Sequence, residues 1–220
     1  MARLRVGILI SGRGSNMQAL IEACAAPGFP AQIALVLANE PGAAGLHRAR
    51  DAGIATRVVD HRGFNKDRAA FERALTAALE EAGVAFVCLA GFMRLLTETF
   101  VARWRDRLIN IHPSLLPAFR GLDTHRRALE AGVRLHGCTV HFVRAAMDDG
   151  PIIVQAAVPV LPSDTEEALA ARVLAAEHRC YPLALKLCAE KRVRVDGERC
   201  VLDGVAVQEA TLINPPPILG

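Results

Sequence analysis

The chain has 220 residues, of which 52% are hydrophobic and 22% are charged, so it holds enough apolar side chains for the packed core of one large domain. The net charge is only +3, the basic residues are scattered and 5% of residues are aromatic, which argues against a nucleic-acid-binding protein. No apolar run approaches the roughly 18 residues of a membrane helix, and the short apolar N-terminal run ends at Gly12 and Arg13 without a signal-peptide cleavage site.

In the first half of the chain, short apolar strands alternate with helical patterns. The strands are predicted at Arg5–Ser11, Ile33–Asn39, Thr56–Val59, Phe86–Leu89 and Leu108–Ile111, and the helices at Asn16–Ala25, Ala43–Ala52, Asp67–Ala82 and about Thr97–Arg103. This alternation predicts a Rossmann-like α/β fold, in which a twisted sheet is parallel in its N-terminal part and carries helices on both faces.

In the second half, strand periodicity predicts strands at Gly137–Val143 and Ile152–Val160. A long helix follows at about Thr165–Glu190, because apolar residues recur there at intervals of three and four. Pro182 lies inside this helix and is expected to kink it near His178.

The last part of the chain is predicted to be less regular. Residues 192–207 have the pattern of a polar hairpin that turns at Asp196-Gly197, and residues 208–220 are expected to form an extended or disordered tail. We find no internal repeat and no linker, so we expect a single domain over residues 1–220.

The six cysteines and seven histidines do not show the spacing of a metal site. The cysteines include no C-x-x-C pair, and four of them lie in apolar stretches, so we expect no metal, no disulfide framework and a reduced, cytoplasmic setting. We interpret His47, His61, His125 and His136 as surface or satisfied core residues.

The loop Ser11–Asn16, with the sequence SGRGSN, joins the first strand to the first helix. Its glycines allow the backbone to approach a ligand, and the following helix N-terminus favours an anion, so the loop is a candidate phosphate site. It is similar to the dinucleotide fingerprint G-x-G-x-x-G, but Met17 replaces the third glycine, and Glu40 stands at the end of the second strand. A tight turn capped by Ser15 or Asn16 is the alternative.

Asn110 and His112 end the fifth strand two positions apart, which places them on one face, and Pro113 stops the strand. Ligands of open α/β sheets bind at this edge. In the turn Asp148-Asp149-Gly150-Pro151, one Asp that faces His112 would favour the charged imidazolium. In such a site, an Asn and a charged His would donate to an oxyanion, and an Asp would transfer protons. This combination predicts direct acyl transfer without a covalent intermediate.

Five segments carry a resemblance to a known family. They are SGRGSN, LAGFMRLLT at 89–97, NIHPSLLPAFRGLDTHRRALEAG at 110–132, HGCTVHFV at 136–143 and MDDGPIIVQAAVPV at 147–160. In this order and spacing, over roughly residues 5–190, the chain resembles the phosphoribosylglycinamide formyltransferases, folate-dependent transferases of purine synthesis that are also called glycinamide ribonucleotide transformylases.

The resemblance implies roles for individual residues of this chain. It implies that Asn110, His112 and Asp148 are catalytic, that the loop at Gly14, Ser15 and Asn16 holds the ribonucleotide phosphate, and that Glu177 contacts its ribose. It further implies a folate site formed by Arg68, Met93, Arg94, Leu95 and Leu96, where the match at Arg68 requires a one-residue insertion after Phe64. Asp149 stands where relatives often have a small residue, which leaves open the choice between the two aspartates.

The family implies the formyltransferase fold and transfer of the formyl group of 10-formyltetrahydrofolate, a co-substrate, to the amine of 5'-phosphoribosylglycinamide. The expected partners are small molecules, not nucleic acid or membrane, and a homodimer is left open. One alternative is another formyl-folate enzyme, namely a tRNA or sugar formyltransferase or a formyl-folate hydrolase. We expect neither the C-terminal domain of the tRNA enzymes nor the N-terminal domain of the hydrolases in this chain. A non-catalytic dinucleotide-binding module is the alternative from another class.

Overall fold

The computed structural model describes residues 2–206 and 212–214. Its strands are β1 (Leu4–Ile10), β2 (Ala31–Ala38), β3 (Thr56–Val58), β4 (Phe86–Leu89), β5 (Leu108–His112), β6 (Leu135–Phe142), β7 (Ile152–Pro159), β8 (Val193–Asp196) and β9 (Arg199–Leu202). Its helices are α1 (Ser15–Ala25), α2 (Gly45–Asp51), the 3₁₀ helix η1 (His61–Phe64), α3 (Arg68–Glu81), α4 (Glu98–Arg103), α5 (Thr124–Glu130) and α6 (Glu166–Ala189).

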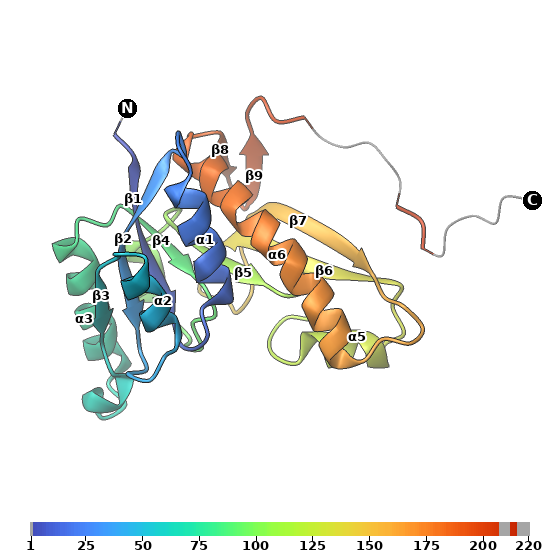
Figure 1. Ribbon diagram of the computed structural model, residues 1–220, viewed down its shortest axis with the longest axis horizontal. Helices are drawn as coiled ribbons and strands as arrows, with labels where there is room; N and C mark the ends of the chain where they lie inside the picture. The colour runs from blue at the N-terminus through green and yellow to red at the C-terminus, as the bar shows by residue number, and fades with distance from the viewer. Residues whose placement is uncertain (1, 207–211, 215–220) are drawn as a thin grey trace, which may run out of the picture.

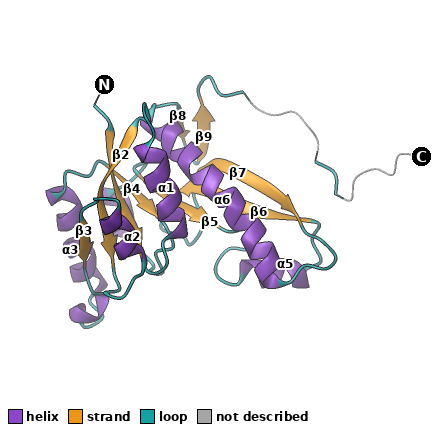
Figure 2. Cartoon of the chain, in the orientation of Figure 1, coloured by secondary structure: helices purple, strands orange, loops and turns teal. Residues whose placement is uncertain are grey.

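The main sheet has seven strands in the order β3-β2-β1-β4-β5-β6-β7, as can be followed in Figure 1. The first five strands pair in parallel, whereas β6 pairs antiparallel with β5 and β7 pairs antiparallel with β6. This confirms the predicted α/β fold with a sheet that is parallel in its N-terminal part. Strands β8 and β9 form a second, two-stranded sheet (Figure 2), and Val193, Val195 and Cys200 of this hairpin pack against the main apolar core.

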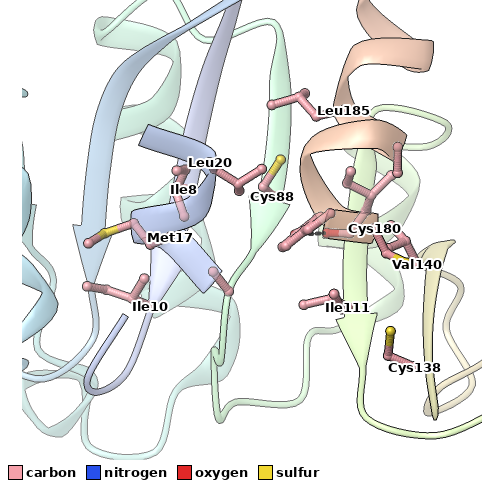
Figure 3. Packing of buried hydrophobic residues seen from close by; sticks show 14 of the residues in the cluster. Ile8, Ile10, Met17, Leu20, Cys88, Ile111, Cys138, Val140, Cys180 and Leu185 are labelled. Atoms are coloured by element: carbon pink, nitrogen blue, oxygen red, sulfur yellow. Dashed lines mark hydrogen bonds between the residues drawn. The ribbon is translucent and has the colours of Figure 1, made fainter. Parts of the chain in front are cut away.

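Helices cover both faces of the main sheet. Neighbouring residues of a strand point to opposite faces, so an apolar strand needs helices on both sides to bury all of its side chains. Ile8 and Ile10 of β1 belong to the apolar cluster that includes α1, α2 and α6, while Leu9 belongs to a second cluster with α3 and α4. Figure 3 shows the first cluster, where Met17 of α1 and Leu185 of α6 pack against the strands. Strands that are buried on both faces explain the continuous apolar runs of the sequence.

The predicted boundaries differ from the structure in a few places. Strand β2 begins at Ala31, two residues before the prediction, and β5 extends one residue further to include His112. The sequence analysis missed η1 and α5. Helix α5 has only seven residues, too few for a clear apolar periodicity, and the Asp123 that precedes it has a left-handed backbone (φ 54°) and makes no capping hydrogen bond through its side chain.

The described C-terminal elements confirm the predicted long helix and hairpin, and the kink near His178 stays a prediction. Helix α6 continues through Pro182, and β8 and β9 form the predicted hairpin, which turns at Gly197 with φ 61°. The predicted tail at 208–220 lies outside the described residues except for 212–214, where the Asn214 side chain donates to the Arg134 carbonyl at 2.6 Å.

Candidate active site

Three candidate segments meet at one edge of the sheet. Because β1, β4 and β5 are parallel neighbours, their carboxyl ends lie side by side. The loop Ser11–Asn16 follows β1, residues 90–97 follow β4, and Asn110 and His112 lie at the end of β5. The structure therefore confirms that the candidate phosphate loop and the Asn-His pair share the carboxyl edge.

The loop after β1 is shaped by Gly14. This residue has φ 71° and ψ 34°, a left-handed conformation that favours glycine, and an added Cβ would lie 3.1 Å from the Gly45 Cα atom. Gly14 precedes α1 without any capping side chain among the described residues, so the alternative of a turn capped by Ser15 or Asn16 is wrong. The first N–H groups of an uncapped helix and its partial positive charge suit an anion.

Helix α2 and Glu40, the candidate ribose-binding acid of the dinucleotide alternative, lie near this loop. The Gly45 N–H of α2 donates to the Gly12 carbonyl at 3.0 Å, so α2 packs directly on the glycine turn. Glu40, the candidate ribose-binding acid, lies 3.5 Å from both the His61 ring and the Arg62 guanidinium. The Glu40 carboxylate therefore already has His61 and Arg62 as neighbours and is not free to bind a ribose.

The structure joins Asn16 to Glu177, which are 161 residues apart in the sequence. The Asn16 Nδ2 group donates to Glu177 Oε2 at 2.8 Å, and Asn16 Oδ1 is buried without a partner among the described residues. Glu177 is 6% exposed, and burial raises the pKa of its carboxyl, an effect that the Asn16 hydrogen bond opposes. A buried, partly satisfied polar pair beside a helix N-terminus is suited to a polar ligand.

His112 lies between two loops. Its Nδ1 atom is 3.4 Å from Asp148 Oδ1, and its Nε2 atom is 3.0 Å from the Phe119 carbonyl oxygen. Asp148 Oδ2 also accepts from the Gly121 N–H at 2.7 Å, whereas Asp149 pairs with Arg120 at 2.8 Å. The structure thus places Asp148, and not Asp149, beside the imidazole, and both ring nitrogens have a neighbour.

Asn110 has a partner that the sequence analysis missed. Its Nδ2 group lies 3.4 Å from His141 Nε2, and His141 Nδ1 lies 2.9 Å from the Phe142 carbonyl oxygen. The carbonyl can only accept, so the proton of His141 belongs on Nδ1, and Nε2 is left to accept from Asn110. Burial lowers the pKa of His141, which keeps this ring neutral. The two residues oppose each other across β5 and β6, a register that the sequence does not reveal.

The candidate folate segment presents apolar side chains to solvent. Met93 is 66% exposed and Leu95 is 64% exposed, Arg94 is also exposed and Leu96 is half-buried. Arg68, at the start of α3, donates to the Leu95 carbonyl at 2.6 Å, so the segment and this arginine do come together. A hollow of about 350 Å³ between the phosphate loop and this segment is lined by residues 11–16 and by Ala90, Gly91 and Met93.

His125 and His136, which we interpreted as surface or satisfied core residues, lie next to each other in the structure. The rings of His125 and His136 are 5.3 Å apart, and Phe119 contacts His136 edge-on at 5.7 Å. Neither ring nitrogen of His136 has a hydrogen-bond partner among the described residues, so that interpretation is wrong for His136. Burial, together with His125, lowers the pKa of His136 to about 4.

The described residues provide neither a metal site nor a membrane-spanning helix. No group of three or more His, Cys, Asp or Glu side chains is placed to hold a metal ion there. None of the helices described combines the length and the apolar character needed to cross a membrane.

Comparison with known proteins gives the family. Residues 4–185 match the family described as formyl transferase. The phosphoribosylglycinamide formyltransferase of Escherichia coli (strain K12) is 44% identical over 201 residues, which cover 91% of this chain and 94% of that protein. The crystal structure of glycinamide ribonucleotide transformylase 1 from Symbiobacterium toebii has a TM-score of 0.89 and 48% identity, and the match covers 91% of this chain and 94% of that chain.

Longer proteins contain a similar segment. The trifunctional purine biosynthetic protein adenosine-3 of Bos taurus is 50% identical over 193 residues, which cover 88% of this chain but 19% of that protein. The chain therefore spans about a fifth of the length of this trifunctional relative. From the extent of the family match, the chain belongs to the formyl transferase family.

Proposed function

We propose that this member of the formyl transferase family transfers the formyl group of 10-formyltetrahydrofolate to the amine of 5'-phosphoribosylglycinamide. The products are formylglycinamide ribonucleotide and tetrahydrofolate, and the reaction belongs to de novo purine biosynthesis. One observation carries this proposal: an uncapped helix N-terminus suited to a phosphate lies at the same sheet edge as Asn110, His112 and Asp148. The similarity to the Escherichia coli phosphoribosylglycinamide formyltransferase over nearly its whole length supports the same substrates.

The ribonucleotide is expected to bind between α1 and the Glu177 side chain of α6. Its phosphate would accept from the first N–H groups of α1 at Ser15 and Asn16, where the helix dipole is favourable. Its ribose hydroxyl groups would donate to Glu177 and to the Asn16 Oδ1 atom, which is buried without a partner among the described residues. This arrangement would give the buried Asn16 Oδ1 atom a hydrogen-bond partner.

The folate is expected to lie on the other side of the trio. Met93, Leu95 and Leu96 offer apolar surface for the pterin ring, and Arg68 and Arg94 offer positive charge for the benzoyl-glutamate end. The hollow between residues 11–16 and Met93 is lined by both the phosphate loop and the candidate folate segment, so the two proposed binding sites adjoin.

In the proposed reaction, the amine nitrogen attacks the formyl carbon and the C=O π electrons move to the oxygen. The Asn110 amide and the His112 imidazolium donate to this developing oxyanion. Collapse of the tetrahedral intermediate re-forms the C=O bond and breaks the bond between the formyl carbon and the folate nitrogen. Asp148, directly or through a water, accepts a proton from the attacking amine and delivers it to the leaving nitrogen, so protons balance.

His112 needs a local rearrangement before it can take this role. Its Nε2 atom contacts the Phe119 carbonyl at 3.0 Å, and Nδ1 faces Asp148. We expect the formyl oxygen to replace the Phe119 carbonyl at Nε2, while the Asp148 contact at Nδ1 persists and holds the ring in place.

The test is a formyl-transfer assay with 10-formyltetrahydrofolate and 5'-phosphoribosylglycinamide. Parallel reactions contain no acceptor, methionyl-tRNA or an amino-sugar nucleotide. Rapid transfer to the glycinamide ribonucleotide alone supports the proposal. Release of formate at the same rate without acceptor would instead show a formyl-folate hydrolase, and transfer to another acceptor would show one of the alternative formyltransferases.

A further inference from the structure

Residues 90–97 form neither helix nor strand, although they carry the exposed apolar side chains of the candidate folate site. The backbone groups of such a segment must find partners elsewhere or remain hydrated. The partners of this segment come from two other elements, and they include residues to which the proposed reaction gives no role.

Ser11 holds the beginning of the segment. Its N–H donates to the Gly91 carbonyl at 3.1 Å, and its Oγ accepts from the Met93 N–H at 2.7 Å. The same hydroxyl donates to Asn39 Oδ1 at 2.6 Å, and Asn39 is 1% exposed. The Ser11 hydroxyl therefore donates its proton to a buried acceptor, the Asn39 Oδ1 atom. This orientation leaves the lone pairs of Ser11 Oγ free to accept from the Met93 N–H.

Glu72 holds the end of the segment. It is 5% exposed, and one carboxylate oxygen accepts from the Thr97 N–H at 2.7 Å while the other accepts from the Thr97 hydroxyl. The Thr97 Oγ1 atom in turn accepts from the Phe100 N–H at 3.4 Å and caps α4. Burial of a carboxylate is unfavourable unless its oxygens are hydrogen-bonded, so this contact strongly restricts where Thr97 can lie.

The contacts are evenly spaced along the segment. Met93, Leu95 and Thr97 are alternate residues, and a side chain from elsewhere in the chain bonds a backbone group of each. Ser11 bonds Met93, Arg68 bonds Leu95 and Glu72 bonds Thr97. Arg68 and Glu72 are four residues apart on α3 and hence on one face of that helix. With its backbone fixed in this way, the segment keeps Met93 and Leu95 in solvent, where isolated apolar side chains would otherwise tend to collapse onto the surface.

We infer that Ser11 and Glu72 are positioning residues for the folate, acting through the backbone of residues 93–97. This inference rests on the proposed function, and in particular on the assignment of the segment to the folate. Ser11 is also the first residue of the phosphate loop, so this one residue holds both the phosphate loop and the candidate folate segment. Without the anchors the folate would have to order the segment as it binds, which lowers affinity but leaves the trio on β5 and its loops untouched.

The experiment measures kcat and the KM of each substrate for Glu72→Ala, Glu72→Gln and a matched control, Glu81→Ala. Glu81 lies on the same helix α3, and its side chain is exposed. Glu72→Ala is expected to raise the KM for 10-formyltetrahydrofolate about tenfold, the size of the loss of about one or two hydrogen bonds. The KM for the ribonucleotide and kcat should change less than about twofold, the scale of an ordinary surface change.

The glutamine variant separates positioning from general stability. Its amide oxygen can still accept from the Thr97 N–H, and its amide N–H can donate to the Thr97 Oγ1 atom, so most of the KM effect should be rescued. A merely structural role would lower the melting temperature of Glu72→Ala and reduce the amount of active enzyme, but it would not raise one KM selectively. An unchanged folate KM in a folded Glu72→Ala protein, or equal increases in both KM values, would overturn the inference.

Ser11→Ala gives an independent test at the other anchor and covers the case in which Glu72→Ala does not fold. It should raise the folate KM by a similar factor, and hydrogen exchange at the Met93 amide should become faster than in the unsubstituted protein. Slow exchange that persists in Ser11→Ala would contradict the assignment of this anchor. Absence of formyl transfer by the unsubstituted protein would contradict the proposed function instead, so the two failures are distinguishable.

Discussion

Asn110 Nδ2 lies 3.4 Å from His141 Nε2, and the other ring nitrogen of His141 faces the Phe142 carbonyl at 2.9 Å. This chain of contacts fixes first the tautomer of His141 and then the orientation of the Asn110 amide. One amide N–H is directed at the ring, and the other is left for an oxyanion. The arrangement links a buried, neutral histidine to the polar group that the proposed reaction requires at the end of β5.

Asn110→Ala is predicted to reduce kcat by roughly 10²–10³, because it removes one donor to the oxyanion. The dissociation constants of both substrates should change little, since the donor acts mainly in the transition state. Steady-state rates and separate binding titrations of each substrate are the measurements. A variant that keeps more than about a tenth of the original turnover would show that Asn110 has no such role.

His141→Phe is predicted to reduce kcat about tenfold, because Asn110 then has no acceptor that orients its amide. The decisive comparison is the double variant with Asn110→Ala. If His141 acts only through Asn110, the double variant should be no slower than Asn110→Ala alone. Two effects that multiply in full would mean that His141 acts independently of Asn110.

Asp148→Asn is predicted to reduce kcat by at least about a hundredfold, the lower range of general acid–base catalysis. The substitution keeps the size of the side chain but removes the charge beside His112 and the proton acceptor. Asp149→Asn is the matched control in the same turn, and it should change kcat less than about threefold, because an exposed ion pair such as Asp149–Arg120 contributes little. The opposite ranking of the two variants would move the catalytic role to Asp149.

Asn16→Leu is predicted to raise the dissociation constant of the ribonucleotide at least about tenfold and to leave that of the folate unchanged. The change removes the Asn16 donor to Glu177 and leaves a buried carboxylate without this partner. Gln18→Leu, at a half-buried position of α1, is the control, since the Gln18 side chain bonds only Glu22 among the described residues. Isothermal titration with each substrate separately gives the answer, and a selective loss of folate affinity would reverse the assignment of the two sites.

Sequence reasoning reached the fold because β1, β2 and β4 are apolar runs buried on both faces, and helical patterns alternate with the strands in this half of the chain. It also placed Asn110 and His112 together, since that relationship depends only on the period of one strand. The pairing of Asn110 with His141 depends instead on the register of β5 against β6, and the contact of Asn16 with Glu177 depends on the docking of α1 against α6. Neither is encoded in local spacing, and the same limit explains why Ser11, Glu72 and the environment of His136 were not predicted.

The last prediction concerns His136, whose buried ring has a pKa of about 4 in the folded protein, well below the ordinary value of 6.5. A histidine with a depressed pKa is neutral when folded but binds a proton when unfolded, so the unfolded state gains protons first as the pH falls. Stability attributable to His136 is therefore fully present above about pH 6.5 and is lost progressively toward pH 4, by up to about 3 kcal/mol. The nearby titratable groups are His125 of α5 and His112 of β5.

His136→Phe keeps an aromatic ring against Phe119 and His125 but cannot titrate. Between pH 7 and pH 4.5 this variant should lose less free energy of unfolding than the unsubstituted protein, as measured by urea denaturation at each pH. His47→Gln, at an exposed position of α2, is the control and should follow the unsubstituted curve. Because the other acid-sensitive groups are common to all three proteins, their contributions cancel in the comparison. Parallel curves for His136→Phe and the unsubstituted protein would show that the ring is protonated as readily in the folded state as in the unfolded state.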